Sequence, residues 1–364
     1  MRLGELLGRN ANNLDIFRMV AACMVIYGHA YSIAPQAGYS DWVERLLGYD
    51  YSGSLAVKIF FFISGLVVTN SLLSRRDAIA FVCSRFFRIW PAFMLVVVVS
   101  ALVIGPIYSS LSLVEYFSSR QFKVIDYVTS NFLMDIRYYL PGVFFELPYE
   151  AAVNGSLWTL YYEVGAYLGL LLMFLLGIFR DKFLATLALV FLLVSQHFVN
   201  ADAMHPIFHQ PILVQCFAFG ALLALYKDSF ELHSGVVFFC WIVFYACAAS
   251  AFSKYLLYIA IFLTILYLSG TKLLLAIKPK TDVSYGIYLW GFPVQQMLAY
   301  HFLDWGVRFN QVAAIVVCIG LGYLSWYLVE ERSIAFGGRV AKNLKARVDR
   351  LVSRLSLKWK SQSA

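Results

Sequence analysis

Three ionisable side chains lie within one apolar segment that is long enough to cross a bilayer, residues 13–33. They are Asp15, Arg18 and His29. Ionisable groups in a spanning helix are costly, so they usually line a cavity and mark a working site. At about 100° and about 1.5 Å per residue, all three share one helix face, with Arg18 and His29 roughly 16 Å apart along the axis. The spacing predicts a polar face that runs from one membrane surface toward the other. The alternative is a structural ion pair beside an unrelated histidine.

Another apolar segment, residues 154–179, carries a carboxylate at a depth in the membrane similar to that of His29. Glu163 shares a helix face with Thr159, four residues earlier. If the chain begins in the cytoplasm, Glu163 and His29 both lie in the outer half of the membrane. A carboxylate near an imidazole can orient its tautomer and make the histidine a better general base. The alternative is that Glu163 pairs with an arginine and only stabilises the fold.

Two arginines, Arg85 and Arg88, are three residues apart at the start of a third apolar segment, residues 81–106. They share one face, and arginine forks match phosphate oxygens. We therefore predict that they meet a phosphorylated donor at the cytoplasmic mouth of the protein; the alternative is ordinary anchoring by positive charge. Arg75 and Arg76 are predicted to be plain anchors. No phosphate-binding glycine loop occurs, so nucleotide hydrolysis is not expected.

No metal site is predicted. The histidines His197, His205 and His209 cluster in the sequence, but their spacing matches no standard metal-ligand set. The six cysteines mostly lie in apolar runs and form no CxxC pair, so they are predicted to be small core residues.

The composition places the chain among α-helical membrane proteins. Of its 364 residues, 61% are hydrophobic and 14% are charged, and the mean hydropathy is +0.72, which excludes a soluble globular domain. We predict an all-α polytopic protein with about ten transmembrane helices. The apolar segments are residues 13–33, 55–73, 81–106, 154–179, 183–199, 207–226, 236–251, 255–269, 283–302 and 311–329.

An even number of crossings puts both termini on one side of the membrane. Cytoplasmic termini place roughly 21 Lys and Arg inside and about 7 outside, as the positive-inside rule requires. The net charge of +8 is thus explained by topology, and nucleic acid is not an expected partner. We divide the chain into a membrane domain, residues 1–331, and a basic tail, residues 332–364. The tail has apolar residues at helical spacing, which is typical of a helix lying on the inner membrane surface.

Several motifs together resemble the acyltransferase family 3 of membrane proteins, which acylate bacterial surface glycans and other extracytoplasmic acceptors. The motifs occur in order between residues 14 and 331. They read LDIFRMVAACMVIYGH, FFFISGL, SRFFRIWP, NGSLWTLYYE, SYGIYLW and a late VEER. The resemblance covers nearly the whole membrane domain. One position departs from it, because Gly291 stands where many relatives have a histidine.

The resemblance implies an O-acyltransferase of the bacterial inner (plasma) membrane. Its donor is cytoplasmic acyl-CoA, expected to be acetyl-CoA, and its acceptor is a hydroxyl of an O-antigen, exopolysaccharide or capsule, free or lipid-linked. Membrane lipids are the other expected partners. It implies an essential His29 and donor-binding arginines at Arg18, Arg85 and Arg88.

The hypothesis that joins these residues is direct transfer, in which His29 deprotonates the acceptor and Glu163 orients it. Transfer through an acyl-histidine is the variant. Tyr162 and Ser284 are candidates for the oxyanion donor. Two other functions stay open at this point. A proton-coupled transporter could use the same groups, although no inverted repeat is evident, and a scaffold would leave the intramembrane groups unexplained.

Overall fold

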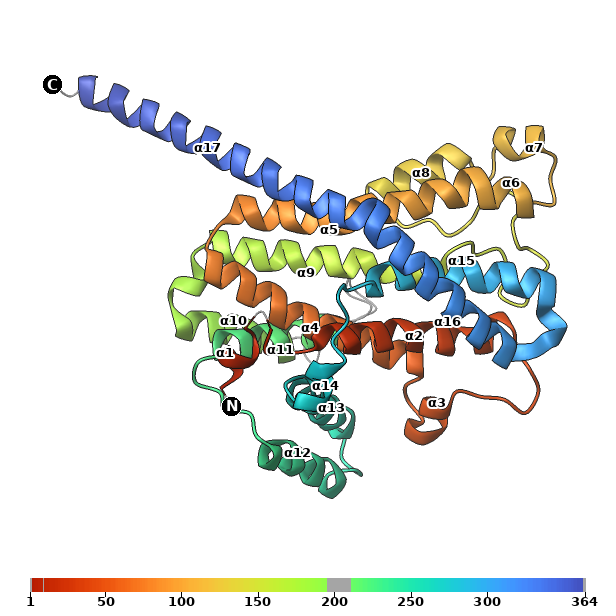
Figure 1. The fold of residues 1–364 in the computed structure, drawn as a ribbon, viewed down its shortest axis with the longest axis horizontal. Coiled ribbons are helices and arrows are strands. Elements are labelled where there is room, and N and C mark those ends of the chain that lie inside the picture. The colour runs from red at the N-terminus through yellow and green to blue at the C-terminus, as the bar shows by residue number, and fades with distance from the viewer. Residues whose placement is uncertain (1, 9, 195–210, 363–364) are drawn as a thin grey trace.

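The chain folds into a bundle of helices (Figure 1). The structure, a computed structural model, describes residues 2–8, 10–194 and 211–362 and contains no β-strand in those ranges. The α-helices are α1 Leu3–Leu6, α2 Leu14–Ile33, α3 Trp42–Leu47, α4 Ser52–Arg75, α5 Ala78–Val99, α6 Gly105–Tyr108, α7 Leu113–Ser118, α8 Val124–Phe132, α9 Trp158–Leu175, α10 Lys182–Val194, α11 Pro211–Leu225, α12 Ser234–Ala246, α13 Ser253–Ser269, α14 Lys272–Ala276, α15 Ser284–Phe302, α16 Gly306–Ser325 and α17 Glu331–Gln362. The short 3₁₀ helices are η2 Gly155–Leu157, η3 Ile178–Arg180 and η7 Leu303–Trp305, and the π-helical turns are η1 Ser100–Ile104 and η8 Trp326–Glu330.

Each of the ten predicted apolar segments has a helical counterpart, although parts of 183–199 and 207–226 lie outside the described residues. Within the described ranges, five helical stretches are long and apolar enough to cross a membrane. They are Leu14–Ile33, Ser52–Arg75, Ala78–Tyr108, Gly155–Leu175 and the continuous Ser284–Leu351. Four shorter apolar helices lie between them. The protein is therefore an all-helical membrane protein.

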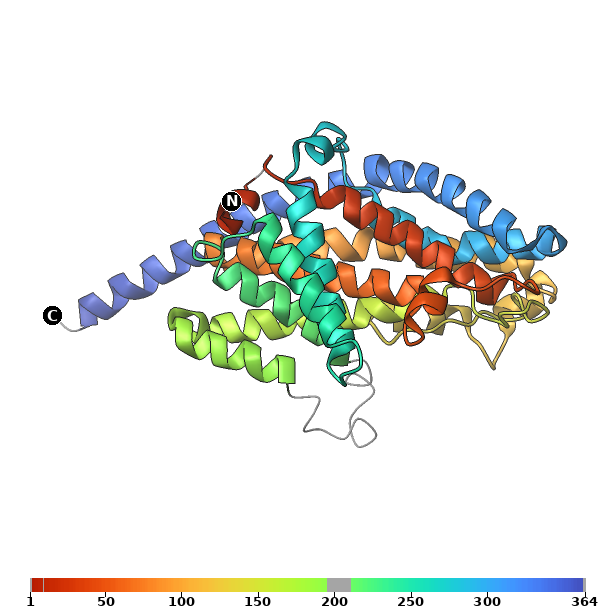
Figure 2. The same ribbon diagram turned by 90° about the horizontal axis from the view of Figure 1, so that it is seen from below.

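Helix α2 carries the first three candidate residues, Asp15, Arg18 and His29. It begins where the side chain of Asn13 accepts a hydrogen bond from the Ile16 amide, which satisfies one free N–H of the first turn. It packs against α4, α15 and α16, as Figures 1 and 2 show from two sides. The α2 side chains that point toward these helices therefore lie inside the protein.

Helices α4 and α11 cross in close contact at Gly65, within the FFFISGL motif. A Cβ atom on Gly65 would lie 2.1 Å from the Phe217 carbonyl oxygen, and one on Gly220 would lie 2.3 Å from the Phe62 carbonyl oxygen. Because neither glycine has a side chain, the two backbones touch directly. The crossing fixes α4, whose Ser64 lies at the candidate site.

The C-terminal helices form one continuous element. Helix α16 runs through the π-helical turn η8 into α17, which packs along α5 and then projects beyond the bundle (Figures 1 and 2). The tail is thus helical over Glu331–Gln362. Helices α1 and α17 both lie away from the end of the bundle that carries α3 and α7 (Figure 1).

Candidate active site

A cluster of charged side chains lies where α2, α5 and the start of α15 meet. Asp282, just before α15, accepts hydrogen bonds on Oδ2 from Arg18 Nη1 at 2.5 Å and Arg88 Nη2 at 2.9 Å. Its Oδ1 accepts from the amide and the hydroxyl of Ser284, at 3.1 and 2.5 Å. Burial by itself raises the pKa of Asp282, but the two guanidinium groups and Ser284 outweigh it, and the pKa is lowered from its ordinary value. The carboxylate is therefore ionised and joins three elements.

The second guanidinium nitrogen of Arg88 is bound by a buried glutamate. Arg88 Nη1 donates to Glu330 Oε2 at 3.0 Å, and Ser325 donates to the other oxygen at 2.8 Å. Glu330 is the last residue of the π-helical turn η8, and such turns commonly reposition a side chain at a functional site. The guanidinium also lies over the Trp326 ring, 5.6 Å from its centroid. Arg88 is consequently fixed on three sides.

The charged cluster forms one wall of a cavity of about 520 Å³, here called the arginine cavity. Its basic lining residues are Arg18, Arg75, Arg85, Arg88 and Lys278. Its acidic lining residues are Asp15, Glu163 and Asp282. The structure thus brings together all three arginines proposed for the donor. Arg75, predicted to be a plain anchor, also faces this cavity.

Arg85 differs from its two neighbours in having no carboxylate partner among the described residues. Its Nε donates to the Ser84 hydroxyl at 3.3 Å, and its guanidinium lies 5.7 Å from the centroid of the Tyr167 ring. Tyr167 in turn donates a short hydrogen bond to Glu163 and shares one with Ser64 at 2.7 Å. The positive charge of Arg85 is therefore available to an anion in the cavity.

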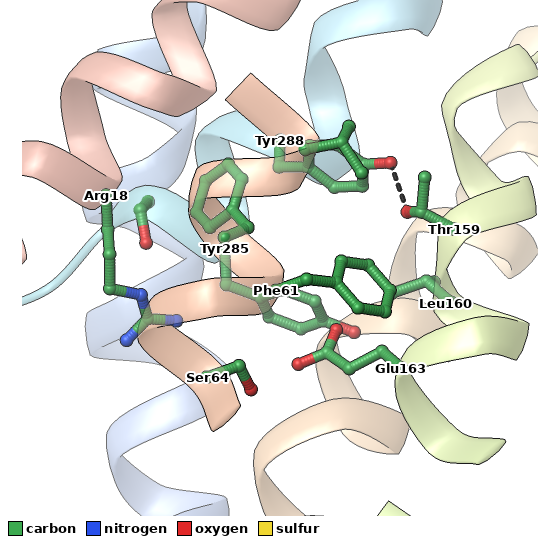
Figure 3. A pocket seen from close by; sticks show the side chains of 11 residues that line it. Arg18, Phe61, Ser64, Thr159, Leu160, Glu163, Tyr285 and Tyr288 are labelled. Carbon is green, nitrogen blue, oxygen red and sulfur yellow. Dashed lines mark hydrogen bonds between the residues drawn. The ribbon is translucent and has the colours of Figure 1, made fainter. Parts of the chain in front are cut away.

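A smaller cavity of about 50 Å³, here called the inner cavity, adjoins the arginine cavity. The two share Arg18, Ser64, Glu163 and Tyr285 as lining residues. Figure 3 shows Arg18 and Glu163 reaching this space from different helices, with the Thr159–Tyr288 hydrogen bond at one side. The two adjoining cavities follow a path from the charged cluster toward Thr159 and Tyr288.

His29 lies beyond that path, in a mostly aromatic setting. Its Nδ1 is 3.4 Å from the Ser156 hydroxyl, and its ring is 5.5 Å from the Phe292 ring and 6.5 Å from the Tyr51 ring. The Ser156 carbonyl accepts a short hydrogen bond from Tyr288, which bonds to Thr159 at 2.5 Å. Thr159 and Tyr288 line the inner cavity. His29 is therefore linked to the wall of that cavity through Ser156 and Tyr288.

The pairing of His29 with Glu163 that we predicted from their depths is not formed. Ser156 occupies the position next to the imidazole, and Glu163 lies seven residues further along the chain, about 10 Å at the helical rise. The Glu163 carboxylate instead accepts from Tyr167, and no arginine bonds to it in the described part of the chain. Glu163 belongs to the wall shared by the two cavities.

The two candidate oxyanion donors are differently placed. Tyr162 packs edge-on against Trp158 and Tyr161, with ring centroids 5.6 and 5.7 Å away, and lines neither cavity. Ser284 lines the inner cavity, but its hydroxyl donates to Asp282. The histidines 197, 205 and 209 lie outside the described residues.

The position without the expected histidine, Gly291, is tightly packed. A Cβ atom there would lie 2.9 Å from Cγ1 of Ile26, one turn before His29 on α2. Because α15 approaches α2 so closely at this point, an imidazole at residue 291 would have to displace Ile26. The glycine is therefore matched to the packing in this chain.

Sequence reasoning did not select Asp282 or Ser156. Asp282 directly precedes the SYGIYLW motif and is the only acidic residue between Glu231 and Asp304, a signal that could have identified it. Ser156 follows Asn154, whose side chain caps the short helix η2 by accepting a hydrogen bond from the Ser156 amide at 3.3 Å. No spacing rule relates either residue to α2, so only the fold could pair them.

Comparisons with known proteins agree on one kind of protein. A family model described as an acyltransferase domain matches residues 11–330. An "O-acetyl transferase" of Shigella phage Sf6 is 30% identical over 88% of this chain and 96% of its own length. "Nodulation protein 10" of Rhizobium leguminosarum bv. viciae is 27% identical over 88% of this chain and 92% of its own length. No solved structure matches.

Proposed function

Because the chain belongs to acyltransferase family 3, whose domain its residues 11–330 match, we propose that it transfers an acetyl group from cytoplasmic acetyl-CoA to a hydroxyl of an extracytoplasmic carbohydrate. The name of the phage relative supports acetyl as the group transferred. The proposal includes ten crossings of the bacterial inner membrane with both termini in the cytoplasm. That topology puts Arg18 on the donor side and His29 on the acceptor side.

One observation carries the proposal: the arginine cavity and His29 lie at opposite ends of α2, and the inner cavity lies between them, with Tyr288 on its wall bonded to Ser156 beside His29. A donor with phosphates at one end and a thioester at the other fits this arrangement. The phosphates would lie among the arginines and the thioester near Thr159 and Tyr288. The alternative function, a proton-coupled transporter that uses the same ionisable side chains, is not supported by the family match, which favours group transfer.

On the donor side, Arg85 is the first contact we propose for a phosphate, because its charge has no carboxylate partner. Arg18 and Arg88 are held by Asp282, which keeps their positions fixed before the donor arrives. Fixed donors bind with less loss of side-chain entropy. Their remaining N–H groups can add charge-assisted hydrogen bonds to the phosphates.

On the acceptor side, His29 acts as the general base. With Nδ1–H directed to the Ser156 hydroxyl, Nε2 takes the proton of the acceptor hydroxyl as its oxygen attacks the thioester carbon. The tetrahedral oxyanion then expels the CoA sulfur as the C–S bond breaks, and the imidazolium returns the proton to the thiolate. The product is an acetyl ester, and no acyl-enzyme is needed. Such a base contributes about 10²- to 10⁴-fold to the rate.

The test compares surface glycan from cells lacking the protein, cells with the wild type and cells with His29→Ala at equal membrane levels. Mass spectrometry should find an alkali-labile acetyl group on the sugar repeat only with the wild type. His301→Ala is the matched control, because His301 is on α15 and its Nε2 bonds to Tyr108 at 3.2 Å. Full acetylation by His29→Ala would refute the assignment of the base, and absence of acetylation with the wild type would refute the glycan acceptor.

A further inference from the structure

A third cavity, of about 290 Å³, lies between α17 and the turn that joins α4 to α5; we call it the tail cavity. Its charged lining residues are Arg75, Asp77, Lys342 and Lys345. Lys345 Nζ donates to Asp77 at 2.7 Å, and Arg75 and Lys342 have no ion-pair partner among the described residues. The tail cavity is therefore net positive, and two of its cations are uncompensated.

The wall formed by α17 is shaped by two consecutive glycines. A Cβ atom on Gly337 would lie 2.6 Å from the Phe87 ring, so α17 is pressed against α5 at this residue. A Cβ atom on Gly338 would meet nothing within 4 Å, and Gly338 lines the cavity. One glycine thus allows the close approach of the helices, and the next leaves room beside it.

The tail cavity adjoins the arginine cavity, since both are lined by Arg75, Ser84 and Ile334. Together they are lined by seven basic side chains, Arg18, Arg75, Arg85, Arg88, Lys278, Lys342 and Lys345, against four acidic ones, Asp15, Asp77, Glu163 and Asp282. The bases without a carboxylate partner include Arg85 in one cavity and Lys342 in the other. Two separated anionic groups on one ligand would suit this distribution.

We propose that the tail cavity binds the 3′-phosphorylated adenosine end of the acyl-CoA donor, with Lys342 and Lys345 at the 3′-phosphate. The proposal rests on the proposed function, which requires an acyl-CoA. Coenzyme A carries a diphosphate between its pantetheine arm and its ribose, and a separate monophosphate on the ribose. With the diphosphate near Arg85, the ribose end is directed toward α17. Lysines bind phosphate as point charges on flexible stems, which suits an exposed monophosphate.

The first experiment compares acetyl-CoA with acetyl-dephospho-CoA, which lacks only the 3′-phosphate, using purified full-length protein. The wild type should prefer acetyl-CoA by about 10- to 100-fold in kcat/KM, the range expected for a charge-assisted contact. In the double variant Lys342→Ala, Lys345→Ala the preference should fall to about one, through KM rather than kcat. Arg339→Ala, Arg347→Ala removes two charges from the same helix outside the cavity lining and should keep the preference.

A second variant keeps both lysines and fills the space. Gly338→Trp should raise KM for acetyl-CoA but leave that for acetyl-pantetheine unchanged, because the shorter donor does not reach α17. Equal effects on both donors, or a double lysine variant that retains the full preference, would overturn the proposal.

A binding measurement separates this inference from the transfer activity. Adenosine 3′,5′-bisphosphate should stabilise the wild-type protein against heat more than adenosine 5′-monophosphate does, and the double lysine variant should lose the difference. If the bisphosphate stabilises the protein in this lysine-dependent way but no acyl-CoA supports transfer, the proposed function is wrong and the assignment of the tail cavity as a phosphate site is retained. If the lysine variants change only binding to anionic vesicles relative to zwitterionic ones, the phosphate recognised belongs to lipid, and the proposal is wrong.

Discussion

The two ends of α2 differ in the side chains that surround them: one end is charged and the other is mostly neutral and aromatic. At the Arg18 end, two arginines are bound by Asp282, and Arg88 is also bound by Glu330, beside a cavity of about 520 Å³. At the His29 end, the imidazole has one neutral hydrogen-bond partner among the described residues, at 3.4 Å, and aromatic rings around it. The first end holds charge in place for an anionic ligand. The second leaves a histidine nitrogen free for a proton.

The largest effect expected from this comparison concerns His29. His29→Gln should lower kcat for acetyl transfer by about 10²- to 10⁴-fold, because it removes the base and leaves the donor site intact. Arg85→Ala should instead raise KM for acetyl-CoA. Steady-state kinetics with purified protein measure both. If His29→Gln raised the donor KM as strongly as Arg85→Ala, the division between the two ends would be wrong.

Breaking the charged end should cost stability. Arg88→Met leaves Asp282 with one arginine and Glu330 with none, and loss of one member of a buried ion pair costs about 3–5 kcal/mol. Thermal unfolding in detergent should show a large drop in the melting temperature. Adding Glu330→Gln to Arg88→Met should recover part of it, because the unpaired charge is then removed. An unchanged melting temperature for Arg88→Met would show that the cluster is not a stabilising element.

The stability contributed by the Arg18 end of α2 should also depend on pH. The folded pKa of Asp282 is lowered below its ordinary value of 3.8, so its contribution to stability is present above about pH 4 and is lost as the pH falls through the folded pKa. Protonation weakens the charge-assisted bonds to the arginines, which are worth about 1.5–3 kcal/mol. As the pH falls below about 4, the free energy of unfolding should fall more steeply for the wild type than for Asp282→Asn. Parallel curves would contradict this.

At the His29 end of α2, a larger side chain at Gly291 should destabilise the protein. Gly291→Leu should cost about 1–3 kcal/mol in the free energy of unfolding, because its Cβ alone approaches Ile26 to 2.9 Å. Gly320→Leu on α16 is the matched control, since a Cβ there meets nothing within 4 Å. Denaturant titration of the two variants measures the difference. Equal stabilities would mean that α15 moves away from α2 freely.

The smallest effect expected is that of Ser156→Ala. It removes the one hydrogen bond to His29 Nδ1, which at 3.4 Å is weak, and a typical neutral bond is worth about 1 kcal/mol. The turnover number should fall by about tenfold or less, with the donor KM unchanged. A loss as large as that of His29→Gln would give Ser156 a role in the chemistry itself.

Much of the helical structure could be predicted from the sequence, because apolar runs of membrane length and their polar boundaries are local signals. The helix from Leu14 to Ile33 and the helical tail both agree with the structure. The number of crossings and the side on which the termini lie stay predictions. Local signals could not locate the π-helical turn that ends at Glu330, which forms inside an otherwise regular helical pattern.

The site could be predicted as a set of residues but not as a set of partners. The three arginines and Glu163 gather at one cavity, as their positions suggested. The partners Asp282 and Ser156 lie 264 and 127 residues along the chain from the groups they bind. Helix depth was too coarse to separate Glu163 from Ser156, because the two are only two turns apart on one polar face.

The crossing of α4 and α11 determines which walls of the site can move. At Gly65 and Gly220 the two backbones touch with no side chain between them, so no change of rotamer can loosen the contact. Ser64, next to Gly65, lines both the arginine cavity and the inner cavity. We therefore expect this wall of the site to keep its position when the donor enters. The opening that admits a donor and releases the product is therefore expected on the sides of the cavities away from this crossing.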